Sequence, residues 1–253
     1  MVRGLEKFKE YFAGYADKYI LIGGAACTVL MEDAGLLFRA TKDLDIVLCV
    51  EALDTEFVTA FWQFIKDGGY QNRQQSTGKK LFYRFYSPSD DTYPVILELF
   101  SRVPDILKLG DNSHLTPIPV DDEMSSLSAI LLDEEYYRFI QEGRREIEGL
   151  PLIGAEHLIP LKVRAWLDMT ALKEKGEAIQ SNDIRKHRND ILRLYQLLSQ
   201  DMRIELPELA KEDMKRFLER IVEEQIDLKG LGLGNIALDE VLKTLRQIYG
   251  LDR

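Results

Sequence analysis

Apolar residues in the first 70 positions recur first at helical and then at strand spacing. Leu5, Phe8, Phe12 and Tyr15 follow one another at intervals of three and four, which is typical of one face of a helix. The short apolar run YILI stops at a Gly-Gly pair, which indicates a buried strand followed by a turn. The elements expected here are a helix over 4–17, a strand over 19–22, a helix from Gly23-Gly24 to about Gly35, a strand over 43–50 and a helix over 53–67 that stops at Gly68-Gly69.

The spacing changes to a period of two between residues 80 and 101. The segments KLFYRFYS and VILELFS flank the turn PSDDTYP, residues 88–94, and this combination predicts a pair of strands. Farther along, HLTPIPV at 114–120 predicts another strand, and the apolar run at 127–140 predicts further strand or helix.

The second half has helical spacing almost throughout. Four helices are expected, with breaks at Gly176 and in KGLGLGN, over residues 155–175, 182–200, 206–225 and 235–250. The chain therefore predicts an α+β fold in which a mixed-sheet domain, residues 1–152, precedes an α-helical bundle, residues 153–253.

The charge balance narrows the classes of function. A net charge of −10 argues against a general coat for DNA or RNA, because phosphate binding depends on basic surface. Cys27 and Cys49 lie in apolar stretches typical of buried thiols. Apolar runs are too short for a membrane span and the N-terminus does not resemble a signal peptide, so we expect a cytoplasmic protein with no membrane partner.

Carboxylates interrupt two of the expected strands. Residues i and i+2 of a strand point to the same side, so Asp43 and Asp45 present two carboxylates together, a donor set that suits Mg²⁺ or Mn²⁺. Alternatively, Asp43 only begins the strand and Asp45 is solvated at a sheet edge. Glu98 is the one charged residue in an apolar strand, and either joins the pair as a third acid or faces outward. Gly23-Gly24 is either a simple tight turn or a helix start that holds a phosphate.

The order strand, Gly-Gly, helix, Asp-x-Asp and a later acidic strand resembles the polymerase-β-like nucleotidyltransferase superfamily. The resemblance implies that residues 1–152 form a palm-like nucleotidyltransferase domain. It further implies that Gly23 and Gly24 contact a triphosphate, that Asp43, Asp45 and Glu98 hold the metal ions, and that Glu98 activates the attacking hydroxyl.

Within that superfamily, the sequence R-A-T-K-D-L-D with Arg39 and Thr41 looks most like the group of AbiEii-type toxins and minimal nucleotidyltransferases. The resemblance implies nucleotide contacts for Arg39, Thr41, Lys162 and Asp190. From the residues alone, Arg39 meets a phosphate or pairs with an acid, and Lys162 meets a phosphate or lies at the rim of its helix interface. Asp190 either holds a lysine or pairs along its own helix. The basic residues of 185–193 are either a nucleic-acid dock or a solvated helix face.

The function expected from these features is the Mg²⁺- or Mn²⁺-dependent transfer of a nucleoside monophosphate from an NTP to an acceptor hydroxyl, with release of pyrophosphate. The resemblance implies a type IV toxin–antitoxin effector that acts on tRNA and has a separate antitoxin partner. Two alternatives remain: modification of a small molecule, such as an antibiotic, or of a protein, and a catalytically silent nucleotide-binding or interaction protein.

Overall fold

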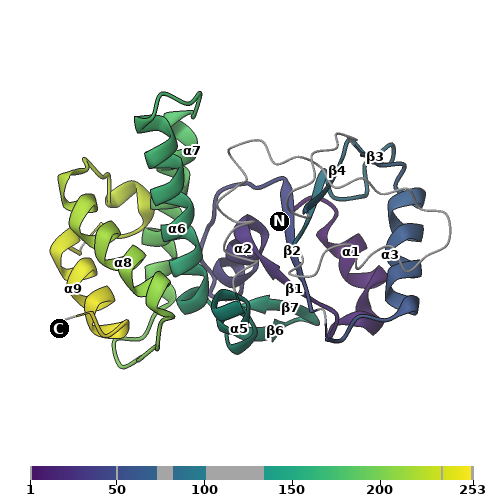
Figure 1. Ribbon diagram of the computed structural model, residues 1–253, viewed down its shortest axis with the longest axis horizontal. Helices are drawn as coiled ribbons and strands as arrows, with labels where there is room; N and C mark the ends of the chain where they lie inside the picture. Colours follow the sequence, from purple (N-terminus) through teal and green to yellow (C-terminus); the bar gives the residue numbers. More distant parts are fainter. Residues whose placement is uncertain (1, 50, 73–81, 101–133, 235, 252–253) are drawn as a thin grey trace. The chain divides into compact units, whose positions relative to one another are not determined.

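The computed structural model describes residues 2–49, 51–72, 82–100, 134–234 and 236–251 (Figure 1). The described chain divides into two compact units. One comprises Met1–Tyr137 and Arg144–Ile153, and the other comprises Arg138–Gly143 and Gly154–Arg253. The first is the sheet unit and the second is the helical unit. None of the described helices combines the length and the apolar character that crossing a lipid bilayer requires.

The sheet unit is built on a mixed sheet, which confirms the predicted α+β class. Among the described residues the sheet has seven strands in the order β3-β4-β5-β2-β1-β7-β6. β2 runs parallel to β5 and antiparallel to β1, and β1 runs parallel to β7. The strands are β1 (Tyr19–Ile22), β2 (Asp43–Leu48), β3 (Gln71–Asn72), β4 (Phe82–Tyr86), β5 (Ile96–Phe100), β6 (Arg144–Ile147) and β7 (Leu150–Ile153).

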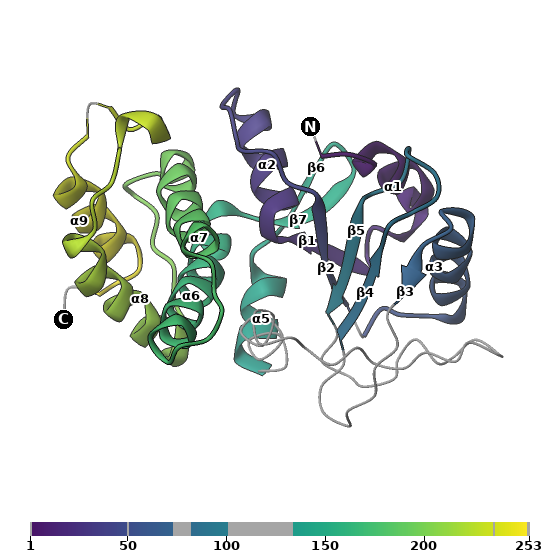
Figure 2. The ribbon, with the colours of Figure 1, turned by 90° about the horizontal axis from the view of Figure 1, so that it is seen from above.

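Helices lie on both sides of this sheet. Figure 2 shows α1 (Leu5–Tyr11) and α3 (Thr55–Asp67) on one side and α2 (Gly23–Asp33) on the other. Aromatic rings fill the layer under α1 and α3, where Phe8 and Phe64 have ring centroids 5.7 Å apart. Phe85 of β4 joins this layer through Phe61, at 5.7 Å, so α1 and α3 cover the side of the sheet to which Phe85 points.

The helix expected over 4–17 is shorter in the structure. It ends at Tyr11 and continues as the 3₁₀ turn Ala13–Tyr15. Glycine at position 14 disfavours a continued α-helix because an unrestricted backbone loses more entropy there. The other expected elements of this part, through the strand pair β4–β5, are present.

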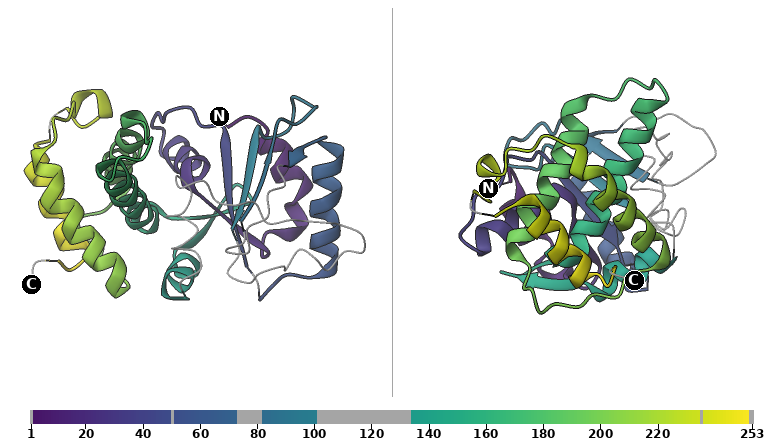
Figure 3. Two further views of the ribbon diagram at one scale, coloured as in Figure 1. Left: turned by 45° about the horizontal axis from the view of Figure 1, so that its top comes forward. Right: turned by 90° about the vertical axis from the view of Figure 1, so that its left-hand side faces the viewer.

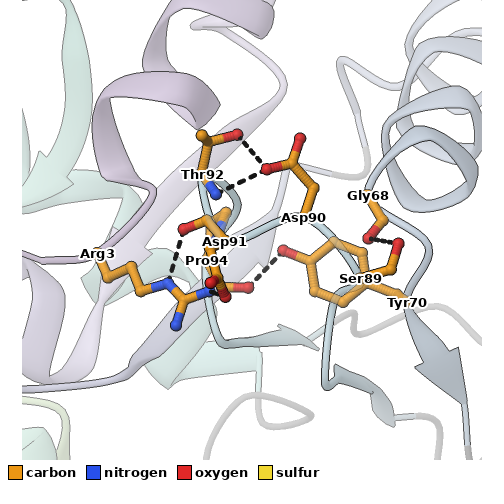
Figure 4. A network of polar contacts seen from close by, with 8 residues as sticks. All are labelled: Arg3, Gly68, Tyr70, Ser89, Asp90, Asp91, Thr92 and Pro94. Carbon is orange, nitrogen blue, oxygen red and sulfur yellow. Dashed lines mark hydrogen bonds and ion pairs between the residues drawn. The ribbon is translucent and has the colours of Figure 1, made fainter.

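The turn between β4 and β5 is anchored by a polar network, shown in Figure 4. Tyr70 donates its hydroxyl to the carbonyl of Pro94 at 2.6 Å, and Arg3 donates Nε to the carbonyl of Asp91 at 2.8 Å. Inside the turn, the Thr92 amide donates to Asp90 Oδ1 at 2.8 Å. These contacts fix the place where β5 begins, and so the position of the residues along it.

The hairpin β6–β7 was not among the predicted elements. Its strands have four residues each and are joined at Glu148 and Gly149, which both have positive φ, 50° and 81°. That backbone matches the tight turns of two-residue hairpins, but Glu-Gly is a weaker signal than Asn-Gly or Asp-Gly. The strand expected over 114–120 lies outside the described residues, and of the run 127–140 the structure describes the start of helix α5 (Glu134–Glu142).

The helical unit contains the four predicted helices, which pack side by side in Figure 3. The 3₁₀ turns Tyr195–Leu197 and Ile221–Glu223 follow the second and third of them. Pro160 lies inside the first helix and has no N–H for the carbonyl of Glu156, and Tyr249 donates its hydroxyl to that carbonyl at 2.8 Å instead. The helices are α6 (Ala155–Glu174), α7 (Ser181–Leu194), α8 (Glu208–Arg220) and α9 (Leu238–Ile248).

Candidate active site

Asp45 and Glu98 are neighbours on parallel strands. They occupy directly opposite positions of β2 and β5, so their side chains lie on the same side of the sheet. Both are buried, with 8% and 7% of their surface exposed. Glu98 therefore does not face outward, and Asp45 is not solvated at an edge. The alternative predictions, an outward-facing Glu98 and a solvated Asp45, are therefore wrong.

The two carboxyl groups are close enough to affect each other strongly. Burial raises the pKa of Glu98 well above its usual range, the charge of Asp45 raises it further, and the Arg84 guanidinium opposes both effects. A hydrogen bond between the Glu98 and Asp45 side chains also favours the protonated form. Two buried carboxylates side by side are stable only when a proton or a cation compensates their charge.

The Gly-Gly turn is built against Asp45. Gly23 has φ +65°, and a Cβ atom there would lie 1.7 Å from Asp45 Oδ2, so no side chain fits. The amide of Gly24 donates to the same oxygen at 3.3 Å. A Cβ at Gly24 would lie 2.6 Å from Thr41 Oγ1, which brings the threonine of the predicted site to the same turn. Helix α2 begins here, so its first amides and the positive end of its dipole lie beside the acidic pair.

Asp43 is the less defined member of the acidic set. It begins β2, is half-buried, lies two residues before Asp45, and its charge contributes a smaller rise in the pKa of Glu98. Among the residues that the structure describes, no three His, Cys, Asp or Glu side chains are gathered closely enough to hold an ion. The oxygen donors at Asp45 and Glu98 nevertheless have the chemistry that Mg²⁺ and Mn²⁺ prefer, and a cation would relieve the repulsion between them.

Sequence reasoning missed Arg84. It is directly opposite Glu98 on β4, and its Nε lies 3.2 Å from Glu98 Oε1, with 39% of the arginine side chain exposed. The signal was present in the hairpin, because Arg84 and Glu98 are each three residues from the positions that flank the turn 88–94. Pairing the strands across that turn would have brought the two residues together.

Arg39 lies in the segment between α2 and β2. Its guanidinium donates to the carbonyl of Ala40 at 3.3 Å and lies 5.4 Å from the centre of the Phe38 ring. Both contacts are with its immediate neighbours in the chain.

Lys162 and Asp190 form a buried pair inside the helical unit. Lys162 Nζ lies 3.1 Å from Asp190 Oδ2, and the two side chains are 7% and 0% exposed. Lys162 therefore does not lie at the rim of the helix interface, and Asp190 holds it from the neighbouring helix α7. Nearby on α7, Lys186 pairs with Asp183 at 3.5 Å and Arg188 pairs with Glu224, so part of the basic cluster is neutralised within the unit.

The sequence and the fold were compared with those of known proteins. No family model matches the sequence, and no curated protein matches it significantly. The fold is similar to the crystal structure of an antigenic nucleotidyltransferase-like protein from Paracoccidioides brasiliensis, with a TM-score of 0.46 and 18% identity over 94% of this chain and 96% of that chain. At that identity and score the resemblance carries no conclusion on activity.

Proposed function

We propose that the protein is a divalent-metal-dependent nucleotidyltransferase that moves a nucleoside monophosphate from an NTP to an acceptor hydroxyl and releases pyrophosphate. The observation that carries this proposal is the buried pair Asp45–Glu98 beside the start of helix α2. A helix start attracts phosphate, and paired carboxylates attract hard cations. A site for a metal–triphosphate complex needs both, and the two features are adjacent in this chain.

Different residues of the site are proposed to contact the phosphates, bind the metal ions and accept the proton. The turn at Gly23 and Gly24 would contact the triphosphate, and Asp43, Asp45 and Glu98 would hold the metal ions. Glu98 would also accept the proton of the attacking hydroxyl, as carboxylates do in general base catalysis. When bound, Mg²⁺ or Mn²⁺ would supply charge neutralisation at the reacting phosphate.

Four further residues belong to the proposal through the family resemblance. Thr41, packed against Gly24, is a phosphate contact next to the turn. Arg39 and Lys162 supply positive charge to the nucleotide, and Asp190 holds the Lys162 ammonium in a fixed position.

The proposed biological role is that of an AbiEii-type effector that modifies tRNA and is controlled by a separate antitoxin. The net charge of −10 favours a second candidate acceptor, since a cationic small molecule such as an antibiotic would be attracted and RNA repelled. A protein hydroxyl is the third acceptor class.

The test uses each NTP labelled at the α-phosphate, with Mg²⁺ and, separately, total tRNA, lysate protein and an aminoglycoside panel. The proposal expects label in one acceptor class and release of pyrophosphate, both lost in Asp45→Asn. Asp33→Asn is the matched control, because Asp33 is an exposed aspartate at the end of α2. A protein that binds Mg²⁺–NTP tightly, releases no pyrophosphate and is unaffected by Asp45→Asn would instead be a silent nucleotide-binding protein.

A further inference from the structure

Three side chains form a row across the sheet. Arg84 on β4, Glu98 on β5 and Asp45 on β2 are directly opposite one another, strand by strand. Residues opposite each other on neighbouring strands lie on the same side of a sheet. The row therefore has one positive side chain, Arg84, at one end, followed by the two acids Glu98 and Asp45. Glu98 is the central member and contacts both neighbours.

Arg84 is the only member of this row that reaches solvent substantially. Its side chain is 39% exposed, whereas that of Glu98 is 9% exposed. The Nε–Oε1 distance of 3.2 Å makes one direct contact with Glu98. An exposed arginine on a flexible stem can turn toward water at little cost, whereas a buried carboxylate cannot leave its place.

We propose that Arg84 is an internal counter-ion of Glu98 that competes with the divalent cation for this carboxylate. This inference rests on the proposed function, because it assumes a metal bound at Asp45 and Glu98. Without metal, the guanidinium compensates part of the buried negative charge. With a metal ion bound, Glu98 would serve the ion as a ligand, and the partly exposed Arg84 would give up its contact with Glu98. Arg84 is thus a positioning residue that acts through Glu98.

The competing explanation is a purely structural role, in which Arg84 only holds Glu98 in a productive orientation. The two roles predict opposite changes in metal affinity. Loss of a competitor tightens metal binding, because a positive charge within a few ångströms of a cation is repulsive. Loss of a support weakens it, because the ligand becomes disordered.

The experiment measures the affinity of the full-length protein for Mn²⁺ alone, by electron paramagnetic resonance of the free ion at low ionic strength. Arg84→Gln and Arg84→Met are expected to bind Mn²⁺ on the order of tenfold more tightly than wild type. Arg84→Met keeps the apolar stem, so it guards against misfolding of the polar variant. Arg84→Lys keeps the positive charge and is expected to stay close to wild type.

Two controls assign the effect to Glu98. Lys66→Gln removes another positive charge of the same unit, an exposed lysine in the last turn of α3, and should leave Mn²⁺ affinity unchanged. In a Glu98→Gln background, which lacks the contested carboxylate, Arg84→Gln should no longer tighten binding.

The outcomes separate the two proposals. If wild type binds Mn²⁺ and both Arg84→Gln and Arg84→Met bind it equally or more weakly, the counter-ion role is overturned while the metal site stands. If wild type binds no Mn²⁺, with or without NTP, the metal site of the proposed function is overturned together with the role of Arg84. Tighter binding in both variants, absent in the Glu98→Gln background, supports the inference.

Discussion

Gly23 and Asp45 are packed so closely that they leave no room for a Cβ atom between them. An added Cβ at residue 23 would lie 1.7 Å from Asp45 Oδ2 and 2.5 Å from its Cγ. The position of the Asp45 carboxylate therefore depends on the absence of a side chain at residue 23. Any side chain at position 23 must displace the carboxylate that the proposed function needs.

Gly23→Ala tests this relationship. We expect a loss of about 1–3 kcal/mol in the free energy of unfolding from the positive φ, and loss of nucleotidyl transfer because Asp45 is pushed from its place. Gly35→Ala is the matched control, since Gly35 has φ +70° but nothing lies within 4 Å of its added Cβ. Urea denaturation and label transfer, measured on both variants, separate strain from displacement. Equal activity in the two variants would contradict the proposed role of the contact.

Glu98→Gln should separate stability from activity. Burial is the largest cause of the raised pKa of Glu98, so its carboxylate form opposes folding at neutral pH. Glutamine removes that charge at nearly the same volume. With divalent ions removed by EDTA, we expect a gain of about 0.5–2 kcal/mol in the free energy of unfolding at pH 7, the range common for single stabilising substitutions. Nucleotidyl transfer should be lost. A destabilised variant would mean that the contact with Arg84 outweighs the burial.

The local parts of the site follow from sequence patterns, whereas its assembly depends on strand pairing. The short apolar strand before Gly23-Gly24 predicts the turn. The alternation of side chains along a strand predicts that Asp43 and Asp45 lie on the same side of the sheet. The side of the sheet on which Glu98 lies depends on the register between β2 and β5, which are far apart in the chain. Such a register is fixed by tertiary packing and is not encoded in either segment alone.

Two other features show where sequence patterns were insufficient. The hairpin β6–β7 has four-residue strands and a Glu-Gly turn, too short and too atypical to stand out from the helices around it. The helical pattern alone did not identify the partner of Lys162, because it allows Asp190 either to hold a lysine of another helix or to pair along its own helix. Packing of α6 against α7 decides in favour of the buried pair.

Tyr249→Phe tests how the helical unit accommodates Pro160. The tyrosine hydroxyl satisfies the Glu156 carbonyl that proline leaves without a donor, at 2.8 Å and inside the core. Its removal leaves a buried acceptor unsatisfied, so we expect a loss of about 1–3 kcal/mol in the free energy of unfolding. Tyr195→Phe is the control, because the Tyr195 hydroxyl makes a longer contact, 3.5 Å, with Thr244. Thermal unfolding that shifts equally in both variants would contradict a special role for Tyr249.

The buried pair Lys162–Asp190 provides a test of function that is independent of stability. Lys162→Met leaves the fully buried Asp190 carboxylate without its ammonium partner, and we expect a loss of about 3–5 kcal/mol in the free energy of unfolding. The double variant Lys162→Met/Asp190→Leu removes both charges of the pair, so most of that stability should return.

Nucleotide binding should respond differently. If Lys162 contacts a nucleotide phosphate as proposed, the stable double variant still lacks the ammonium and should bind Mg²⁺–NTP at least about tenfold more weakly than wild type, the effect of losing roughly 1.4 kcal/mol. Isothermal titration calorimetry at a temperature where both proteins are folded gives the comparison. Wild-type nucleotide affinity in the double variant would assign the pair a purely structural role, because its positive charge would then be dispensable once the core is intact.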